Sequence, residues 1–218
     1  NFNVIDYFLN KTDNFLWFSS STGYPNKNKK LNEKDFFKGR LPLFLHAGNH
    51  SRLIEKKLEL LSKNSRTKFI TVRTPEVFGK FDNFNENNCR DVPLLIKGYL
   101  NQLKNFYYLD FNFKKNYIFA TDLAKISLKI INKSKKKYQV FNVCDDNSYN
   151  LKNFINIFEK KLKKSNIFFL NKKIKDIKYQ KSLNNSKVKR FLGFNSIGNL
   201  QKSIKKTIKW YSINYKIL

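Results

Sequence analysis

The feature that most constrains this chain is an alternation of short β-branched and aromatic runs with longer segments of helical period. Such runs predict three strands, at residues 14–19, 68–73 and 138–143. Apolar residues recur at helical spacing in four further stretches, which we interpret as helices: residues 51–63, 122–131, 151–162 and 200–211. Strands that alternate with helices in this way form parallel βαβ units, so the sequence predicts an α/β fold.

Local details of these elements carry further predictions. In the helix predicted at residues 51–63, the charged side chains, Glu55 and Glu59 among them, fill the face that the apolar residues leave free. Asn150 is expected to cap the helix that follows it. The first predicted strand ends in hydroxyl residues, Ser19 to Ser21. Open α/β sheets bind ligands at the carboxyl ends of their strands, so a candidate binding site lies there.

The charge of the chain favours anionic partners. Lysine and arginine number 44 and aspartate and glutamate 16, which gives a formal net charge of +28. Counterion release would reward binding to nucleic acid. The lysines are, however, spread along nearly the whole chain, and the runs at residues 27–30 and 133–137 lack interleaved aromatic residues. We therefore interpret them as solvated surface, which disfavours nucleic acid as a partner and leaves a small anion such as a diphosphate favoured.

The sequence lacks several patterns that are typical of metal-binding and membrane-spanning proteins. The two cysteines, Cys89 and Cys144, and the two histidines show no metal-binding spacing, so no metal is expected. No apolar run approaches the roughly 18 residues needed to cross a bilayer, so a membrane is not an expected partner. A reducing cytoplasm is the expected location. The sequence begins at Asn1 and contains no methionine, which predicts that it is the carboxy-terminal part of a longer protein.

Five segments occur in the order of a known family: SSSTGYP at 19–25, RTPEVFG at 73–79, YIFATDLA at 117–124, VFNV at 140–143 and NSKVKRFLGF at 185–194. The first resembles a strand-end serine motif, and the others resemble R-P-x-N-V-Y-G, F-I-Y-V-D-D-L-A, Y-N-V-G and D-x-S-K-A-x-x-x-L-G-W. Each segment alone is weak evidence. In register across nearly the whole chain, they make it resemble an extended short-chain dehydrogenase/reductase of the NAD-dependent epimerase/dehydratase family.

The resemblance implies an NAD(P)-binding Rossmann-like fold, a doubly wound parallel sheet whose amino-terminal half is missing here, with a smaller mixed α/β substrate lobe. We assign residues 1–84 and 116–144 to the Rossmann domain, and residues 85–115 and 145–218 to the lobe. The implied cofactor is NAD or NADP, and the implied substrate is a nucleotide-diphosphate sugar used in polysaccharide biosynthesis. A homodimer is expected by analogy with family members.

The same resemblance locates the catalytic positions. In the family, a tyrosine hydroxyl exchanges a proton with the sugar, and a lysine four residues later lowers the tyrosine pKa. Register with the following helix places these positions at Ala47 and Ser51. Neither residue can act as expected, because alanine has no proton to give and serine carries no positive charge. Ser21, by its position at the strand end, is expected to hydrogen-bond the reacting oxygen.

Two interpretations of these replacements stay open. Either the protein is catalytically impaired and still binds a nucleotide sugar, or His50, Tyr24 or His46 has taken over proton transfer. His50 has a suitable unperturbed pKa, but it lies three residues beyond Ala47 and so projects on a neighbouring face of the helix. These residues can also have no catalytic role. In that case the histidines are packed or solvent-facing side chains, and Tyr24 packs in the interior.

The resemblance also implies residues that bind the cofactor and part of the substrate. Ser19, Pro75 and Val77 are expected to bind NAD(P), with the backbone of Pro75 and Val77 facing the nicotinamide carboxamide. Thr22 is expected to contact the substrate.

Two charged residues are expected at the diphosphate of the substrate. Glu76 stands where the family has an asparagine that contacts the diphosphate, and a carboxylate there would repel that group. Lys115, or alternatively Lys114, takes the place of an arginine that pairs with the phosphates. Plain surface charge is the other interpretation of both lysines.

The sequence thus favours an NAD(P)-dependent nucleotide-sugar epimerase/dehydratase family protein with impaired or altered catalysis. Two alternatives stay open. One is a non-catalytic binding or partner protein on the same fold, and the other is a polyanion- or nucleic-acid-binding protein that uses the net charge.

Overall fold

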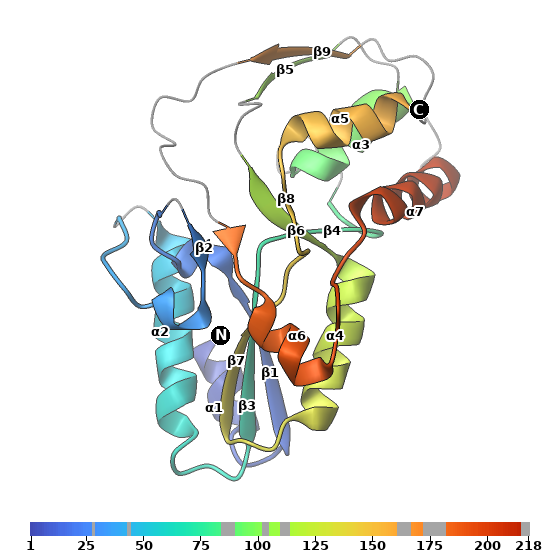
Figure 1. The fold of residues 1–218 in the computed structure, drawn as a ribbon. Helices are drawn as coiled ribbons and strands as arrows, with labels where there is room; N and C mark the ends of the chain where they lie inside the picture. The colour runs from blue at the N-terminus through green and yellow to red at the C-terminus, as the bar shows by residue number, and fades with distance from the viewer. Residues whose placement is uncertain are drawn as a thin grey trace.

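The architecture, seen in a computed structural model, is a parallel sheet covered by helices with a smaller lobe at one end (Figure 1). The structure describes residues 1–27, 29–42, 45–83, 90–101, 105–109, 114–160, 167–171 and 182–214. The sheet contains β1 (Asn14–Ser20), β3 (Lys68–Thr74) and β7 (Tyr138–Asn142) in the order β1-β3-β7, with both pairs parallel. The strands alternate with helices along the chain, which confirms the predicted α/β fold.

Helices cover both faces of this sheet, as the doubly wound arrangement requires. On one face, α1 (Phe2–Phe8) and α2 (His46–Leu61) pack against Phe69 of β3. On the other face, α4 (Ala120–Lys133) and α6 (Ser186–Leu192) pack against Ile70 and Val72. Figure 1 shows α2 and α4 on opposite sides of the strands. The two faces follow from the alternation of side chains along a strand.

The smaller lobe is built around a second sheet and three helices. Its strands are β4 (Glu76–Phe78), β6 (Lys115–Phe119) and β8 (Ser148–Tyr149), in the order β4-β6-β8, with β6 and β8 antiparallel. The helices α3 (Asp91–Asn101), α5 (Leu151–Glu159) and α7 (Leu200–Asn214) enclose a core that contains Phe78, Tyr117 and Phe154.

Several short elements complete the fold. Two-stranded parallel pairs form between β2 (Lys30–Leu31) and β10 (Ser182–Leu183), and between β5 (Asn105–Leu109) and β9 (Ile167–Asn171). Two 3₁₀ turns, η1 (Ser21–Gly23) and η2 (Glu33–Asp35), follow β1 and β2.

The predicted elements agree with the structure except near their ends. The helix predicted at residues 51–63 begins earlier, at His46, because its polar first turn hides the helical period. The Asn150 cap is confirmed, since its side chain accepts a hydrogen bond of 3.1 Å from the backbone N–H of Asn153. Residues 161–162 of the third predicted helix lie outside the described residues. The interpretation of Glu55 as part of an outward-facing charged surface is wrong, because its side chain is fully buried against the sheet.

The cores do not follow the proposed domain boundaries in every detail. Val188 and Ile197, which we assigned to the lobe, pack into the core of the main sheet. Phe78 and Phe119, assigned to the Rossmann domain, belong to the core of the lobe. The partition into two domains stays a prediction.

Among the described residues, none of the helices has the length and apolar character needed to cross a membrane. The same residues contain no group of three or more histidine, cysteine, aspartate or glutamate side chains placed to hold a metal ion.

Candidate functional site

The candidate site lies at the carboxyl ends of β1 and β3, where η1 contacts α2 and where the chain continues from β3 into β4. A Cβ atom at Gly48 would lie 2.6 Å from the carbonyl oxygen of Thr22, so this close approach of α2 to η1 requires glycine. Arg52 stabilises the contact between α2 and η1, because its Nε donates a hydrogen bond of 2.8 Å to the Gly23 carbonyl. These contacts hold the first turn of α2 against the serine-rich end of β1.

The two positions that we predicted to replace the family tyrosine and lysine lie in the first two turns of α2. Ala47 is exposed, and Ser51 is buried with its hydroxyl donating to the Ala47 carbonyl at 2.8 Å. Ser51 therefore satisfies its own hydroxyl within the helix. His50 is exposed, and its ring centroid lies 6.5 Å from that of Phe2 in α1. The structure thus places His50 toward the side of α2 that faces α1.

The hydroxyl residues of η1 stay partly accessible. Ser21 and Thr22 are both half-buried. The Thr22 hydroxyl donates to the Ser20 hydroxyl at 2.9 Å, and the backbone N–H of Thr22 donates to the same oxygen at 3.1 Å. The turn is therefore held in shape by its own side chains, with Ser21 at its start.

A buried polar network lies beneath this turn, and we call it the Arg73 network. The sheet register pairs Ser19 with Arg73 and Arg73 with Asn142. Arg73 forms an ion pair of 2.7 Å with Glu55, and the Ser19 hydroxyl donates to the same carboxylate at 2.5 Å. The Tyr24 hydroxyl accepts from Arg73 at 2.9 Å and donates to Asn142 at 2.5 Å. Every charged or hydroxyl group of the network has an internal partner.

The network includes two side chains that we predicted to be functional, Tyr24 and Ser19. Tyr24 is 0% exposed, and burial raises its pKa well above the ordinary value, so its hydroxyl stays protonated. Ser19 is 4% exposed and its hydroxyl is committed to Glu55. The roles predicted for Tyr24 in catalysis and for Ser19 in cofactor binding stay predictions, but the structure directs both hydroxyls into the protein interior.

Sequence reasoning missed the centre of this network. Arg73 was treated only as part of a motif, although an arginine inside a β-branched strand needs a buried counter-charge. The position of Glu55 could have indicated that counter-charge, because Glu55 lies next to Ile54 on the buried side of α2. The pairing of the two residues depends on how α2 packs on the sheet.

A second set of charges, which we call the Lys115 cluster, borders the site on the lobe side. Lys115 Nζ lies 2.6 Å from Asp91 and 3.2 Å from Glu76. Arg90 lies 3.7 Å from Glu76 and 2.7 Å from Asp82. Burial of Lys115 disfavours its charge, but the carboxylates of Asp91 and Glu76 outweigh that effect and raise its pKa above the ordinary value. The structure therefore brings together two residues that we predicted to bind substrate, as partners of each other.

The segment after β3 carries the remaining predicted cofactor residues. Pro75 and Val77 are half-buried, and β4 pairs with β6 through Val77 and Ile118. We predicted that this backbone lines the nicotinamide end of an NAD(P) molecule, and that role stays a prediction. The pyrophosphate of such a cofactor binds a glycine-rich turn at a helix amino terminus, and the sequence contains no G-x-G-x-x-G.

A model of the NAD dependent epimerase/dehydratase family matches residues 1–144. The chain belongs to this family. No curated protein sequence matches the chain. Its family membership therefore rests on the family pattern and agrees with the fold.

Solved structures of nucleotide-sugar enzymes share the fold of this family member. A UDP-N-acetylglucosamine 4-epimerase from Methanobrevibacter ruminantium M1, in complex with UDP-N-acetylmuramic acid, is 20% identical with a TM-score of 0.80, covering 96% of this chain and 66% of that chain. A GDP-L-fucose synthetase from Naegleria fowleri bound to NADP is 17% identical with a TM-score of 0.81, covering 94% and 65%.

A third similar structure carries both kinds of ligand. A UDP-glucuronic acid 4-epimerase from Bacillus cereus, in complex with UDP-glucuronic acid and NAD, is 18% identical with a TM-score of 0.77, covering 93% of this chain and 62% of that chain. The present chain thus spans about two thirds of the length of the structures it matches. At these identities the likeness establishes the fold.

Proposed function

We propose that this epimerase/dehydratase family member binds a nucleotide-diphosphate sugar with NAD or NADP, and that its proton transfer is impaired or altered. The observation that carries the proposal is the first turn of α2. Ala47 and Ser51 occupy the tyrosine and lysine positions, in a helix that still docks on η1 through Gly48. The helix thus keeps its contact with η1, while the tyrosine and lysine that would transfer and promote the proton are absent from it.

The ligand classes follow from the family and from the similar structures. Those structures contain UDP-sugars, NAD or NADP. In this chain, the backbone of Pro75 and Val77 is proposed to line the nicotinamide end of the cofactor, and Thr22 the sugar. Bound NAD(P) would supply hydride transfer, while the protein supplies orientation.

Ser21 is proposed to hold the reacting oxygen of the sugar. Its half-buried position at the start of η1 leaves it partly accessible, unlike Ser19. A hydroxyl at this point can donate a hydrogen bond but cannot act alone as a general base at neutral pH. The proton itself would need a group such as His50, which is exposed on the neighbouring face of α2.

The decisive experiment restores the missing pair. The wild-type protein and the double variant Ala47→Tyr/Ser51→Lys are titrated with NAD⁺ or NADP⁺ and a panel of UDP-, GDP- and dTDP-sugars, and product formation is measured. We expect the wild-type protein to bind with little turnover. The double variant should gain about 100-fold or more in turnover, the usual contribution of a positioned acid/base group.

A matched control isolates the hydroxyl. Ala47→Phe/Ser51→Lys places the same ring and the same charge without a proton to transfer, so its turnover should stay at the wild-type level. Ordinary turnover by the wild-type protein that His50→Ala abolishes would contradict impairment and make His50 the acid/base group. Absence of any nucleotide-sugar binding would contradict the proposal as a whole.

Two predictions about the whole protein belong to the same proposal. We propose a homodimer, by analogy with the family, and a cytoplasmic location. Sedimentation equilibrium of the protein would show the first, with a mass of one chain contradicting it. Fractionation of cells that express the protein would show the second.

A further inference from the structure

A cavity of about 400 Å³ opens between α4, α7 and the segment that joins α6 to α7. Its walls come from segments far apart in the sequence: α4 and the end of β6 on one side, residues 194–199 above, and the first turns of α7 opposite. Phe119 and Ile126 give it an apolar floor, and Ile197 adds an apolar side chain from the segment above. None of the site residues proposed above lines it, so it is separate from the candidate site at the ends of β1 and β3.

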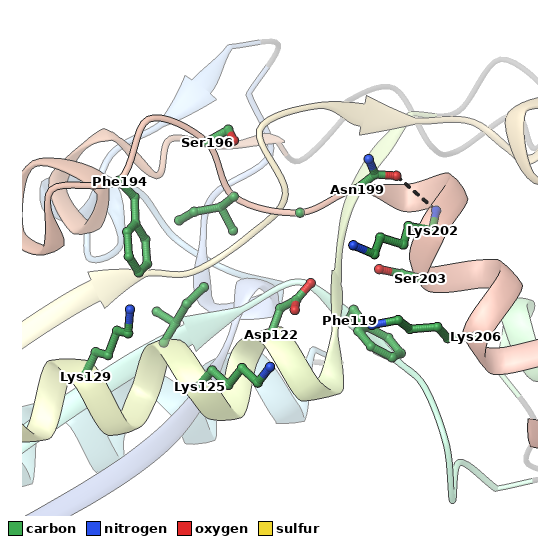
Figure 2. A pocket seen from close by; sticks show the side chains of 13 residues that line it. Phe119, Asp122, Lys125, Lys129, Phe194, Ser196, Asn199, Lys202, Ser203 and Lys206 are labelled. Carbon is green, nitrogen blue, oxygen red and sulfur yellow. Dashed lines mark hydrogen bonds between the residues drawn. The ribbon is translucent and has the colours of Figure 1, made fainter.

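Four lysines face this cavity. Lys125 and Lys129 lie one helical turn apart on α4, and Lys202 and Lys206 lie one turn apart on α7. Figure 2 shows the two rows extending from their helices toward the same space, with Phe194 and Ser196 above them. Side chains at this spacing share a helix face, so the folding of the two helices sets the four charges around one opening.

The charges around the opening are unbalanced. Asp122 is the one carboxylate among the residues that line the cavity, against four ammonium groups. Within the part of the chain that the structure describes, none of the four lysines belongs to an ion pair. Lys129 lies 4.8 Å above the ring of Phe194, which orients its stem along the wall. Four like charges around one opening repel one another, and a bound anion would relieve that repulsion.

A neutral polar surface continues from the lysines. A second cavity of about 460 Å³ shares Gly198 and Asn199 with the first. Its lining is rich in side-chain amides, together with the ring of Tyr149, and contains no charged residue: Asn147, Asn153, Asn156, Asn199 and Gln201. Amides both donate and accept hydrogen bonds, as the hydroxyl groups of a sugar require.

The segment between the two cavities is held firmly. The carboxylate of Asp146 accepts from the backbone N–H of Ile197 at 3.1 Å, from Asn185 at 2.8 Å and from Lys189 at 3.1 Å. Gly198 has a φ of +85°, and a side chain there would collide with Asp145. The segment that lines both cavities, between the lysines and the amides, is therefore fixed by the fold.

From these features we propose that the paired cavities bind a phosphorylated sugar, with the phosphate held by the lysines of α4 and α7 and the hydroxyl groups by the amides beyond Asn199. This site is additional to the nucleotide-sugar crevice. A phosphate dianion would bring negative charge to the point where the four ammonium groups repel one another.

The test uses glucose 1-phosphate as the probe, titrated calorimetrically into the protein at low ionic strength. Lys202→Gln/Lys206→Gln removes two charges that face the cavity. Lys205→Gln/Lys209→Gln removes two exposed charges from the same helix that do not line it. We expect the first variant to weaken binding about tenfold or more, since charge-assisted hydrogen bonds are lost, and the second to stay close to wild type.

The controls separate this site from net charge and from the crevice. Equal weakening by both variants would overturn the proposal, because it would show a general effect of charge. Equal binding of inorganic phosphate and glucose 1-phosphate would overturn the sugar part, and so would binding of the probe that Asn156→Ala leaves unchanged. Nucleotide-sugar binding should be the same in both lysine variants, so a failure of either site is distinguishable from a failure of the other. Thermal unfolding confirms that each variant is folded.

Discussion

The Arg73 network and the Lys115 cluster both lie near the candidate site but differ in their access to water. The ion pair of Arg73 and Glu55 has side chains that are 2% and 0% exposed. Lys115 and Glu76 are 25% and 20% exposed, and they share their charges with Arg90 and Asp91. Both clusters use residues that the family motifs mark, yet water screens only the second.

This difference in exposure to water determines how easily each cluster can rearrange. In the interior, a charge that loses its partner is left unsolvated, so the Arg73 network is fixed and locks η1, α2 and the sheet into one register. At the crevice, water can replace a lost partner, so the Lys115 cluster can rearrange at small cost when a ligand enters. The predictions that follow test this separation, from the largest expected effect to the smallest.

Removing the charge of Glu55 should have the largest effect. Glu55→Gln leaves the Arg73 guanidinium buried without a counter-charge, which costs about 3–5 kcal/mol of the free energy of unfolding. Urea denaturation followed by circular dichroism would measure this loss. A change below 1 kcal/mol would mean that water reaches the network, and the contrast between the two clusters would fail.

The matched control lies on the same helix. Glu59 pairs with Lys56 at 2.7 Å, and its side chain is 42% exposed. Glu59→Gln makes the same chemical change on the solvent side of α2, so it should cost no more than about 1 kcal/mol. Comparable losses in the two variants would show that burial of the charge is not what matters.

Tyr24→Phe should have an intermediate effect. It removes the hydroxyl that joins Arg73 to Asn142 and leaves both with an unmet hydrogen bond, at a cost of about 1–3 kcal/mol. Nucleotide-sugar binding and any turnover, measured well below the unfolding midpoint, should not change. Loss of turnover with unchanged stability would instead make Tyr24 a catalytic residue, and the network would no longer be purely structural.

How far the sequence leads depends on whether a feature is local. The strands β1, β3 and β7 could be predicted because β-branched runs carry their own signal, and the position of η1 follows from the end of β1. Helix α3 was missed because Pro93 and Gly98 interrupt its pattern, although a proline in the first turn is tolerated. Helix α1 was also missed, because its seven residues are too few to show a helical period.

Features that join distant segments could not be predicted in this way. Glu55 and Arg73 are 18 residues apart, and they meet only because α2 packs across β3. The partners of Lys115 were equally hidden: Glu76 was recognised as a departure from the family asparagine, but its pairing with Lys115 depends on the register of β4 with β6. The expected repulsion of a diphosphate by Glu76 is therefore partly offset by two cations, Lys115 and Arg90.

Replacing Glu76 by the family residue should have the smallest effect on stability and the clearest effect on binding. In Glu76→Asn, Lys115 keeps Asp91 as a partner, so we expect a loss of less than about 1 kcal/mol. If the diphosphate binds beside Glu76, as we predicted from the family resemblance, removing the carboxylate should tighten nucleotide-sugar binding by about fivefold, an effect that weakens as salt is added. Lys115→Gln provides the opposite change and should weaken binding. If Glu76→Asn weakened binding as well, Glu76 would contact the ligand directly. The Lys115 cluster would then need its present arrangement, as the Arg73 network does.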